Sequence, residues 1–313
     1  MDFVTGGLAA AGASIFSNPL DVLKTRMQLQ GELKARGQHA VHYRNVFHAA
    51  YVVVKHDGLK GLQKGLGPAT LMHCVRNSVR LGSYQWLHNN GYLTDNEGKT
   101  VFIYSFAASA VCGAAGAFFG SPLFMIKTQL QSQAAKTIAV GFQHGRTGTL
   151  QAVRDIYNTH GIRGLWRGCG GNMIRALAGS SAQLASFAKS KEYLAEYSLF
   201  VKYPVLNSLI ASIIGGILQT ICMQPFDLVS VRLYNQVESN QSRGSLYVEY
   251  DKGVDATGKG LLYNGILDCF IKIFRAEGIY GFYKGITANY MRLAPHGALC
   301  LEFGVTILLW ISN

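Results

Sequence analysis

Four arginines occupy regularly spaced positions in apolar stretches of this chain. Counting seven residues beyond the glycine of three basic-Gly pairs (Lys64-Gly65, Arg167-Gly168 and Lys284-Gly285) gives Met72, Arg175 and Arg292. Steps of four and eight more residues continue the same helix face, over Arg76 and Arg80, Gly179 and Gln183, and His296 and Cys300. None of these nine positions is acidic. Because the guanidinium fork binds carboxylate, sulfate or phosphate with two parallel hydrogen bonds, the pattern predicts a site for a small anion.

A single arginine in an apolar segment has a simpler explanation, since its side chain can extend to the membrane surface or bond to the backbone. Four in one register favour a functional site, because a charge at membrane depth costs several kcal/mol unless it is paired or wetted. Arg175 and Arg292 lie on different segments and can each hold one end of the solute, which favours a dianion. Neutral donors near them are Ser180, Ser181 and Gln183.

Two histidines lie beside these positions. His296 is one turn from Arg292 and His73 follows Met72. Since histidine titrates near neutral pH, proton-coupled transport is one interpretation. Core packing or a simple donor role explains either residue equally well.

The segments that carry these residues belong to a unit that occurs three times. Pro19, Pro122 and Pro225 lie 103 residues apart, and about 14 extra residues fall between Asn235 and Leu262. Apolar stretches long enough to span a bilayer occur twice in each unit, at roughly 2–28, 66–88, 101–131, 169–196, 204–234 and 286–310. Shorter amphipathic stretches lie between them, at 44–56, 148–159 and 264–276. We expect an all-α membrane protein of six transmembrane helices and three surface helices, in repeats 1–95, 96–198 and 199–313 of a single domain.

Composition argues against other classes of protein. Hydrophobic residues make up 49% and charged residues 15% of the chain, which is too apolar for separate soluble domains. The net charge of +12 is dispersed rather than gathered in one stripe, which favours attraction of anions over nucleic-acid binding. The six cysteines lie far apart, without metal-binding or redox spacing. We see no catalytic constellation and no phosphate loop, and therefore predict a transporter rather than an enzyme, with no metal.

Acids and bases follow the three prolines at fixed distances. Proline kinks a helix, so three kinked helices can converge at one end of a bundle. The residues two and five places after each proline are Asp21 and Lys24, Phe124 and Lys127, and Asp227 and Ser230. Opposite charges at the convergence predict a gate closed by ion pairs between neighbouring helices.

Three blocks of the form Pro-x-acid-x-x-base, each followed by a block of the form acid-Gly-x4-aromatic-basic-Gly, resemble the mitochondrial carrier family over essentially the whole chain. Phe124 and Ser230 depart from the first pattern, and His160 and Gln63 depart from the second. The resemblance implies a six-helix barrel of threefold pseudosymmetry in the mitochondrial inner membrane, with surface helices on the matrix side and alternating access to a central site. The family's contact points for the solute match Met72, Arg175 and Arg292. No cofactor is implied, but cardiolipin is expected at the helix starts near Gly65, Gly168 and Gly285, on a monomer.

The family's pairing order joins the acid of one repeat to the base of the next. It implies the pairs Asp21–Lys127 and Asp227–Lys24, and a non-ionic pair of Phe124 with Ser230. Both lost charges thus fall in one pair, and no charge is left alone at a cost of roughly 3–5 kcal/mol. Nine residues after each proline, Gln28, Gln131 and Tyr234 are expected to brace the pairs. The acids of the family's cytoplasmic motif are absent near Tyr84, Phe187 and Phe303, so apolar packing or hydrogen bonds are expected there.

The stretches from Arg175 to Leu184 and from Arg292 to His296 resemble the oxaloacetate–sulfate carrier branch and its animal relatives. That implies transport of oxaloacetate, malonate, sulfate or a related acid such as phosphoenolpyruvate, by exchange or with a proton. Two alternatives on the same fold stay open: a proton-leak or uncoupling-type carrier, and a membrane adaptor that transports nothing.

Overall fold

The computed structural model describes residues 2–34, 42–93, 102–146, 148–197, 204–236 and 262–293. Each repeat begins with a long helix that contains its proline and ends ten residues later: α1 (Asp2–Leu29), α4 (Phe102–Ser132) and α8 (Pro204–Asn235). A second long helix follows: α3 (Leu66–Asn89), α6 (Cys169–Leu194), and one that begins at Ile286 and is described to Leu293. The described residues contain no strand.

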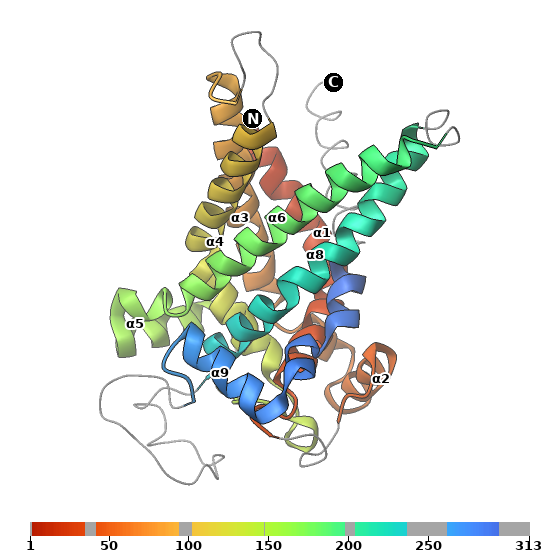
Figure 1. Cartoon of the computed structure of the whole chain (residues 1–313). Helices are drawn as coiled ribbons and strands as arrows, with labels where there is room; N and C mark the ends of the chain where they lie inside the picture. Colours follow the sequence, from red (N-terminus) through yellow and green to blue (C-terminus); the bar gives the residue numbers. More distant parts are fainter. Residues whose placement is uncertain are drawn as a thin grey trace.

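Short helices connect the two long helices of each repeat. They are α2 (Val46–Asp57), α5 (Thr149–Leu165) and α9 (Ile266–Glu277), with the 3-10 turns η1 (Leu59–Gln63), η2 (Lys136–Ile138) and η3 (Ile279–Tyr283). Gly58, Gly161 and Gly278 adopt positive φ angles of 71°, 62° and 70°, so each short helix is interrupted at the same point of its repeat. All three short helices lie around one end of the bundle (Figure 1).

The second long helix of each repeat starts against the first long helix of the next repeat. Its N-cap glycine, Gly65, Gly168 or Gly285, has a φ angle of 72° to 76°. A Cβ on Gly65 would lie 3.2 Å from the carbonyl oxygen of Lys127, and one on Gly285 would lie 3.4 Å from that of Lys24. Glycine therefore permits both the left-handed conformation and the close approach that joins the three repeats into a ring.

Backbone carbonyls that the prolines leave without a helical partner find donors from the next segment. Pro122 lacks an N–H for the carbonyl of Phe118, and the indole Nε1 of Trp166 donates to it over 3.1 Å. In the first repeat the Gln63 side chain donates to the carbonyl of Ile15 over 3.4 Å. The residue before each of these basic-Gly pairs thus ties the short-helix segment to the proline helix.

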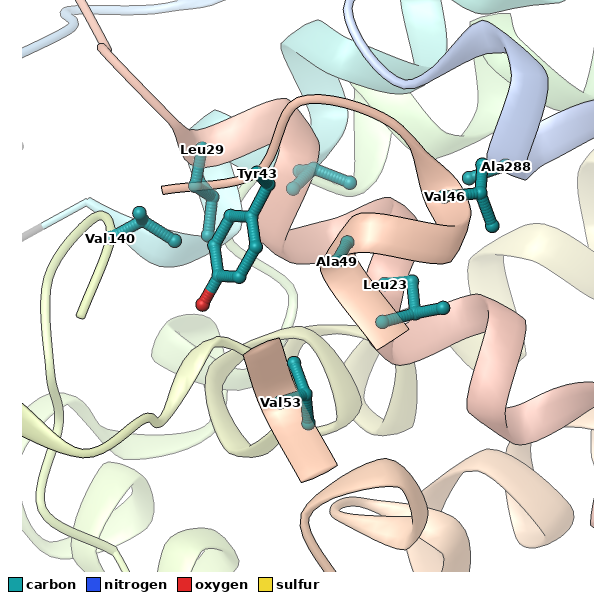
Figure 2. Close-up of a cluster of buried hydrophobic side chains, with 9 residues drawn as sticks. Leu23, Leu29, Tyr43, Val46, Ala49, Val53, Val140 and Ala288 are labelled. Atoms are coloured by element: carbon teal, nitrogen blue, oxygen red, sulfur yellow. The ribbon is translucent and has the colours of Figure 1, made fainter. Parts of the chain in front are cut away.

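Apolar clusters attach the short helices to the ends of the proline helices. Figure 2 shows one of them, where Val46, Ala49 and Val53 of α2 pack with Leu23 and Leu29 of α1. The corresponding clusters of the other repeats surround Ile156 and Ile273. These contacts hold the C-terminal halves of α1, α4 and α8, which carry the predicted gate.

Two of the described helices are long and apolar enough to cross a membrane by length and composition, over Ile103–Ser132 and Leu209–Asn235. A helix begins within one residue of the start of each of the six predicted spans, and the sixth of these helices is described as far as Leu293. Six membrane crossings remain a prediction.

Candidate functional site

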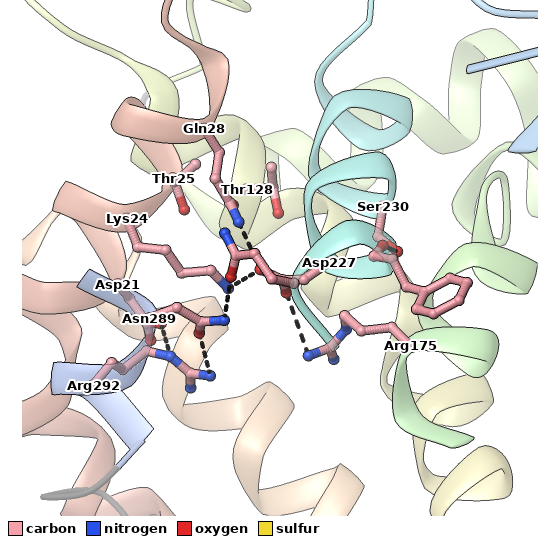
Figure 3. Close-up of polar contacts among 12 residues, drawn as sticks. Asp21, Lys24, Thr25, Gln28, Thr128, Arg175, Asp227, Ser230, Asn289 and Arg292 are labelled. Carbon is pink, nitrogen blue, oxygen red and sulfur yellow. Dashed lines mark hydrogen bonds and ion pairs between the residues drawn. The ribbon is translucent and has the colours of Figure 1, made fainter. Parts of the chain in front are cut away.

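Two buried ion pairs join the proline helices where they converge. The Nζ atom of Lys127 lies 2.8 Å from Oδ2 of Asp21, and that of Lys24 lies 2.6 Å from Oδ2 of Asp227. All four side chains are at most 6% exposed. The pairs connect α1 to α4 and α8 to α1, as the pairing order implied. Figure 3 shows the pair of Lys24 with Asp227.

Arginines from the second long helices reach the same two carboxylates. Nε of Arg292 lies 3.2 Å from Oδ1 of Asp21, and Nη1 of Arg175 lies 3.5 Å from Oδ1 of Asp227. Each aspartate therefore directs one oxygen to a lysine of the predicted gate and the other to an arginine of the predicted anion site. Figure 3 shows both arginine contacts and the lysine contact of Asp227. Spacing along the chain gave no sign that the gate and the anion site touch.

A buried asparagine holds each of these arginines. Oδ1 of Asn172 accepts hydrogen bonds from Nη2 and Nε of Arg175, over 2.7 and 3.2 Å, and Oδ1 of Asn289 accepts one from Nη2 of Arg292, over 3.3 Å. Asn172 also donates to the carbonyl of Ala117 on α4. These asparagines were not predicted from the sequence. Each lies three residues before its arginine, and residues i and i+3 share a helix face, so this spacing could have indicated the contact.

The third position of the ring contains no ion pair. Ser230 donates to the carbonyl of Phe226 in its own helix, over 2.7 Å. Phe124 packs against Tyr234 at a ring distance of 5.3 Å, and the guanidinium of Arg175 lies 4.9 Å from the centre of the Phe124 ring. The phenylalanine that replaces an acid thus supports Arg175 through a cation–π contact.

A cavity beside the ion pairs is lined by residues of all three repeats: Asp21, Lys24, Thr25, Met72, His73, Arg76, Phe124, Lys127, Thr128, Gln131, Arg175, Val231 and Arg292. Of the predicted solute-binding residues, it brings together Met72, Arg76, Arg175 and Arg292. Arg76 forms no ion pair in the described part of the chain. No group of three or more histidine, cysteine or carboxylate side chains in that part could hold a metal.

Four other predicted solute-binding residues, Arg80, Ser180, Ser181 and Gln183, are not among the residues that line this cavity. Arg80 and Gln183 are exposed farther along their helices, and Ser181 is half-buried. The hydroxyl of Ser180 faces α4, where a Cβ on Gly113 would lie 3.4 Å from it. His296 lies outside the described residues, as does Cys300.

The three predicted braces differ in what they contact. Nε2 of Gln28 donates to Oδ2 of Asp227 over 2.7 Å, beside the Lys24 pair. Gln131 instead donates to Asn18 and accepts from Thr25, and Tyr234 shares a hydrogen bond with Ser121. The helix positions are equivalent, but Gln131 finds a nearer polar partner and Tyr234 lies against Phe124, where there is no ion pair to brace.

A second set of ion pairs lies beneath the first, toward the short helices. Seven residues after their prolines, Arg26 lies 2.7 Å from Asp57 and Arg232 lies 2.5 Å from Glu277. The equivalent positions of the second repeat are occupied by Gln129 and His160, and Gln129 accepts a hydrogen bond from Arg146. In the sequence, Asp57 and Glu277 stand out only as the acids of the acid-Gly block. Their partners Arg26 and Arg232 were not predicted, although both lie seven residues after a proline and this shared distance could have indicated them.

The carboxylates of this second set have depressed pKa values. Burial alone would raise the pKa of Glu277, but hydrogen bonds and charge from Arg232 and Lys284 outweigh it and hold the pKa below its ordinary value. The pKa of Asp57 is also lowered against the effect of burial, chiefly by Arg26 and then by Lys64.

Comparison with known proteins decides the family. The model of the mitochondrial carrier protein family matches residues 1–92, 98–198 and 201–307. The chain belongs to the mitochondrial carrier family. It is 47% identical to solute carrier family 25 member 35 of Mus musculus, over 97% of this chain and 96% of that protein. It is 38% identical to the mitochondrial oxaloacetate transport protein of Saccharomyces cerevisiae (96% and 86% covered) and 34% identical to mitochondrial citrate transporter E of Aspergillus niger (96% and 90% covered).

The family resemblance seen in the sequence is thereby confirmed, as is its closeness to an oxaloacetate carrier. Mitochondrial carriers are transporters rather than enzymes, and the relatives named above include carriers of oxaloacetate and citrate. The oxaloacetate and citrate carriers to which this chain is similar are named as mitochondrial proteins.

Proposed function

We propose that this protein is a multi-pass carrier of the mitochondrial inner membrane that moves a small dicarboxylate-like or inorganic dianion by alternating access. Candidate solutes are oxaloacetate, malonate, sulfate and phosphoenolpyruvate. The names of the oxaloacetate and citrate carriers to which it is similar support an oxoacid or carboxylate solute. The ion pairs Asp21–Lys127 and Lys24–Asp227 act as the gate on the matrix side.

The excess of positive charge in the cavity carries this proposal. Five basic side chains line it: Lys24, Arg76, Lys127, Arg175 and Arg292. Among the described residues, the carboxylates that contact them are Asp21 and Asp227. Three positive charges therefore have no carboxylate partner among these residues, and an uncompensated charge at membrane depth is unfavourable in free energy. A dianion held between Arg175 and Arg292 removes two of them, and Arg76 remains for a further polar group of the solute.

The test is uptake into proteoliposomes that contain the purified protein. Radiolabelled sulfate, malonate, oxaloacetate and phosphoenolpyruvate are each offered outside, with the same anion or none inside, so that exchange and uniport are distinguished. For Arg175→Ala and Arg292→Ala we expect kcat/KM to fall roughly 10- to 150-fold, because each loses a charge-assisted contact of about 1.5–3 kcal/mol. Arg154→Ala, at an exposed position on α5, is the matched control.

The two alternative functions give different results in the same vesicles. A proton-leak carrier conducts protons without saturable uptake of any of the four anions. A membrane adaptor shows neither conductance nor uptake. Saturable uptake that Arg175→Ala and Arg292→Ala leave unchanged would also overturn the proposal, because the solute would then bind elsewhere.

Proton coupling through His296 is part of this proposal as one mode of transport. We expect His296→Asn to change the pH dependence of uptake if the histidine carries the proton. The proposal also includes a monomer that holds cardiolipin at the starts of the second long helices, since the N-cap glycines of α3 and α6 leave their first N–H groups without a side-chain cap.

A further inference from the structure

We propose that Asp21 and Asp227 act as internal counter-anions, which the transported anion must displace from Arg292 and Arg175. This rests on the proposed function and adds how solute binding reaches the gate. When the anion takes the arginine, each aspartate loses one of its two basic partners. The gate is thus weakened by the binding event itself.

The observation that carries this inference is a three-way junction at each aspartate. Asp21 of the first repeat contacts Lys127 of the second and Arg292 of the third. The second junction has the same arrangement rotated by one repeat, with Asp227, Lys24 and Arg175. Each junction therefore takes one charged residue from every repeat, and both connect the gate to the anion site.

The third junction is absent as a whole. Applying the same rotation gives Phe124 in place of the acid, Ser230 in place of the lysine and Met72 in place of the arginine. Met72 and Phe124 belong to one buried apolar cluster. Even the supporting asparagine is missing, because Ala69 stands where the other repeats have Asn172 and Asn289. Acid, lysine, arginine and asparagine thus occur together or not at all, which is expected if they work as one unit.

The arginine side of each junction is the side that can be exchanged. The lysine contacts of 2.6 and 2.8 Å are shorter than the arginine contacts of 3.2 and 3.5 Å. Within the described residues, Nε of Arg292 and Oδ1 of Asp227 also lack a partner with hydrogen-bond geometry. An anion that offers good geometry to these arginines can therefore replace the carboxylate, while the buried asparagines keep each guanidinium in place.

The decisive experiment removes the charge of Asp227 and of Lys24, first separately and then together. The dissociation constants for malonate and sulfate are measured by thermal shift on wild type, Asp227→Asn, Lys24→Gln and the double variant Asp227→Asn/Lys24→Gln. Asp227→Asn frees Arg175, so we expect about tenfold tighter binding, or 1.4 kcal/mol. Lys24→Gln leaves the aspartate on the arginine, and binding should not tighten.

The double variant separates this inference from a general effect of charge. It keeps the net charge of the protein, leaves no buried charge of this pair alone, and still frees Arg175. We expect it to bind about tenfold more tightly than wild type, whereas Lys189→Gln/Glu192→Gln, at an exposed ion pair, should not differ from wild type. The corresponding variants of Asp21 and Lys127 repeat the test at Arg292.

Each outcome has one meaning. If the double variant binds with the wild-type dissociation constant, or if Lys24→Gln tightens binding as much as Asp227→Asn, the inference is wrong although the protein is an anion carrier. A wild-type protein that binds and transports none of the four anions overturns the proposed function as well.

Discussion

The ion pair of Arg232 with Glu277 offers a direct test of how the end of the bundle that carries the short helices is held together. The Glu277 side chain is 2% exposed and accepts hydrogen bonds from Arg232 over 2.5 and 3.0 Å and from Lys284 over 2.6 Å. It also accepts one from the backbone N–H of Leu33 in the first repeat, over 2.9 Å. Glu277→Gln keeps the shape but removes the carboxylate charge that contacts the fully buried Arg232.

Removing one partner of a buried ion pair costs about 3–5 kcal/mol. With roughly 2 °C of melting temperature per kcal/mol for a chain of this size, Glu277→Gln should melt about 6–10 °C below wild type in a thermal-shift assay in detergent. Glu192→Gln is the matched control, because the Lys189–Glu192 pair is exposed and its loss should not move the melting temperature measurably. Adding Arg232→Met to Glu277→Gln should restore part of the loss, since it removes the unpaired charge.

The reasoning is refuted if Glu277→Gln melts within about 1 °C of Glu192→Gln. Such a result would mean that water or a rearranged Lys284 compensates Arg232, and that the second set of ion pairs contributes little to the stability of the protein.

Three further outcomes are expected from the same assay. Because folding lowers the pKa of Glu277, its carboxylate contributes fully to stability above the ordinary pKa of 4.5, and this contribution is lost as the pH falls through the pKa of the folded protein. The melting temperature of wild type should therefore drop more steeply in acid than that of Glu277→Gln. Gly65→Ala should lower the melting temperature more than Gly145→Ala. Both glycines have positive φ angles, but only at Gly65 would the new Cβ meet neighbouring atoms, with the Gln131 side chain at 3.0 Å. Equal losses of melting temperature would assign the whole effect to backbone strain. Trp166→Phe should lower the stability by about 1 kcal/mol, because it removes the hydrogen bond to the carbonyl of Phe118. Trp86→Phe, at an exposed position, should leave the stability unchanged. Equal stabilities of the two variants would show that the carbonyl of Phe118 needs no donor.

Much of the architecture could be predicted because it is encoded in local spacing. The 103-residue period, the prolines inside long helices and the glycines that interrupt short helices all depend on residues within one repeat. The short helices begin and end within a few residues of the predicted amphipathic stretches, apart from α5, which continues past Gly161 to Leu165.

Contacts between repeats were less accessible. Gln131 and Tyr234 occupy the same helix position as Gln28, yet only Gln28 reaches an aspartate, because the neighbouring side chains differ. The prediction that Ser180 supplies a donor to the solute met the same difficulty, since the hydroxyl faces α4 rather than the cavity. Periodicity places a residue on a helix face, but the rotation of that helix against its neighbours decides what the face meets.

The sequence by itself determined the family, the threefold repeat, the arginines on one face and the matched loss of charge at Phe124 and Ser230, since these follow from residue types at fixed distances along the chain. Only the tertiary structure decided that Arg292 and Arg175 end on the gate carboxylates. Those atoms come from helices of different repeats, and whether they meet depends on how the helices cross and on the asparagines that orient each guanidinium. No spacing within a single chain segment carries that information.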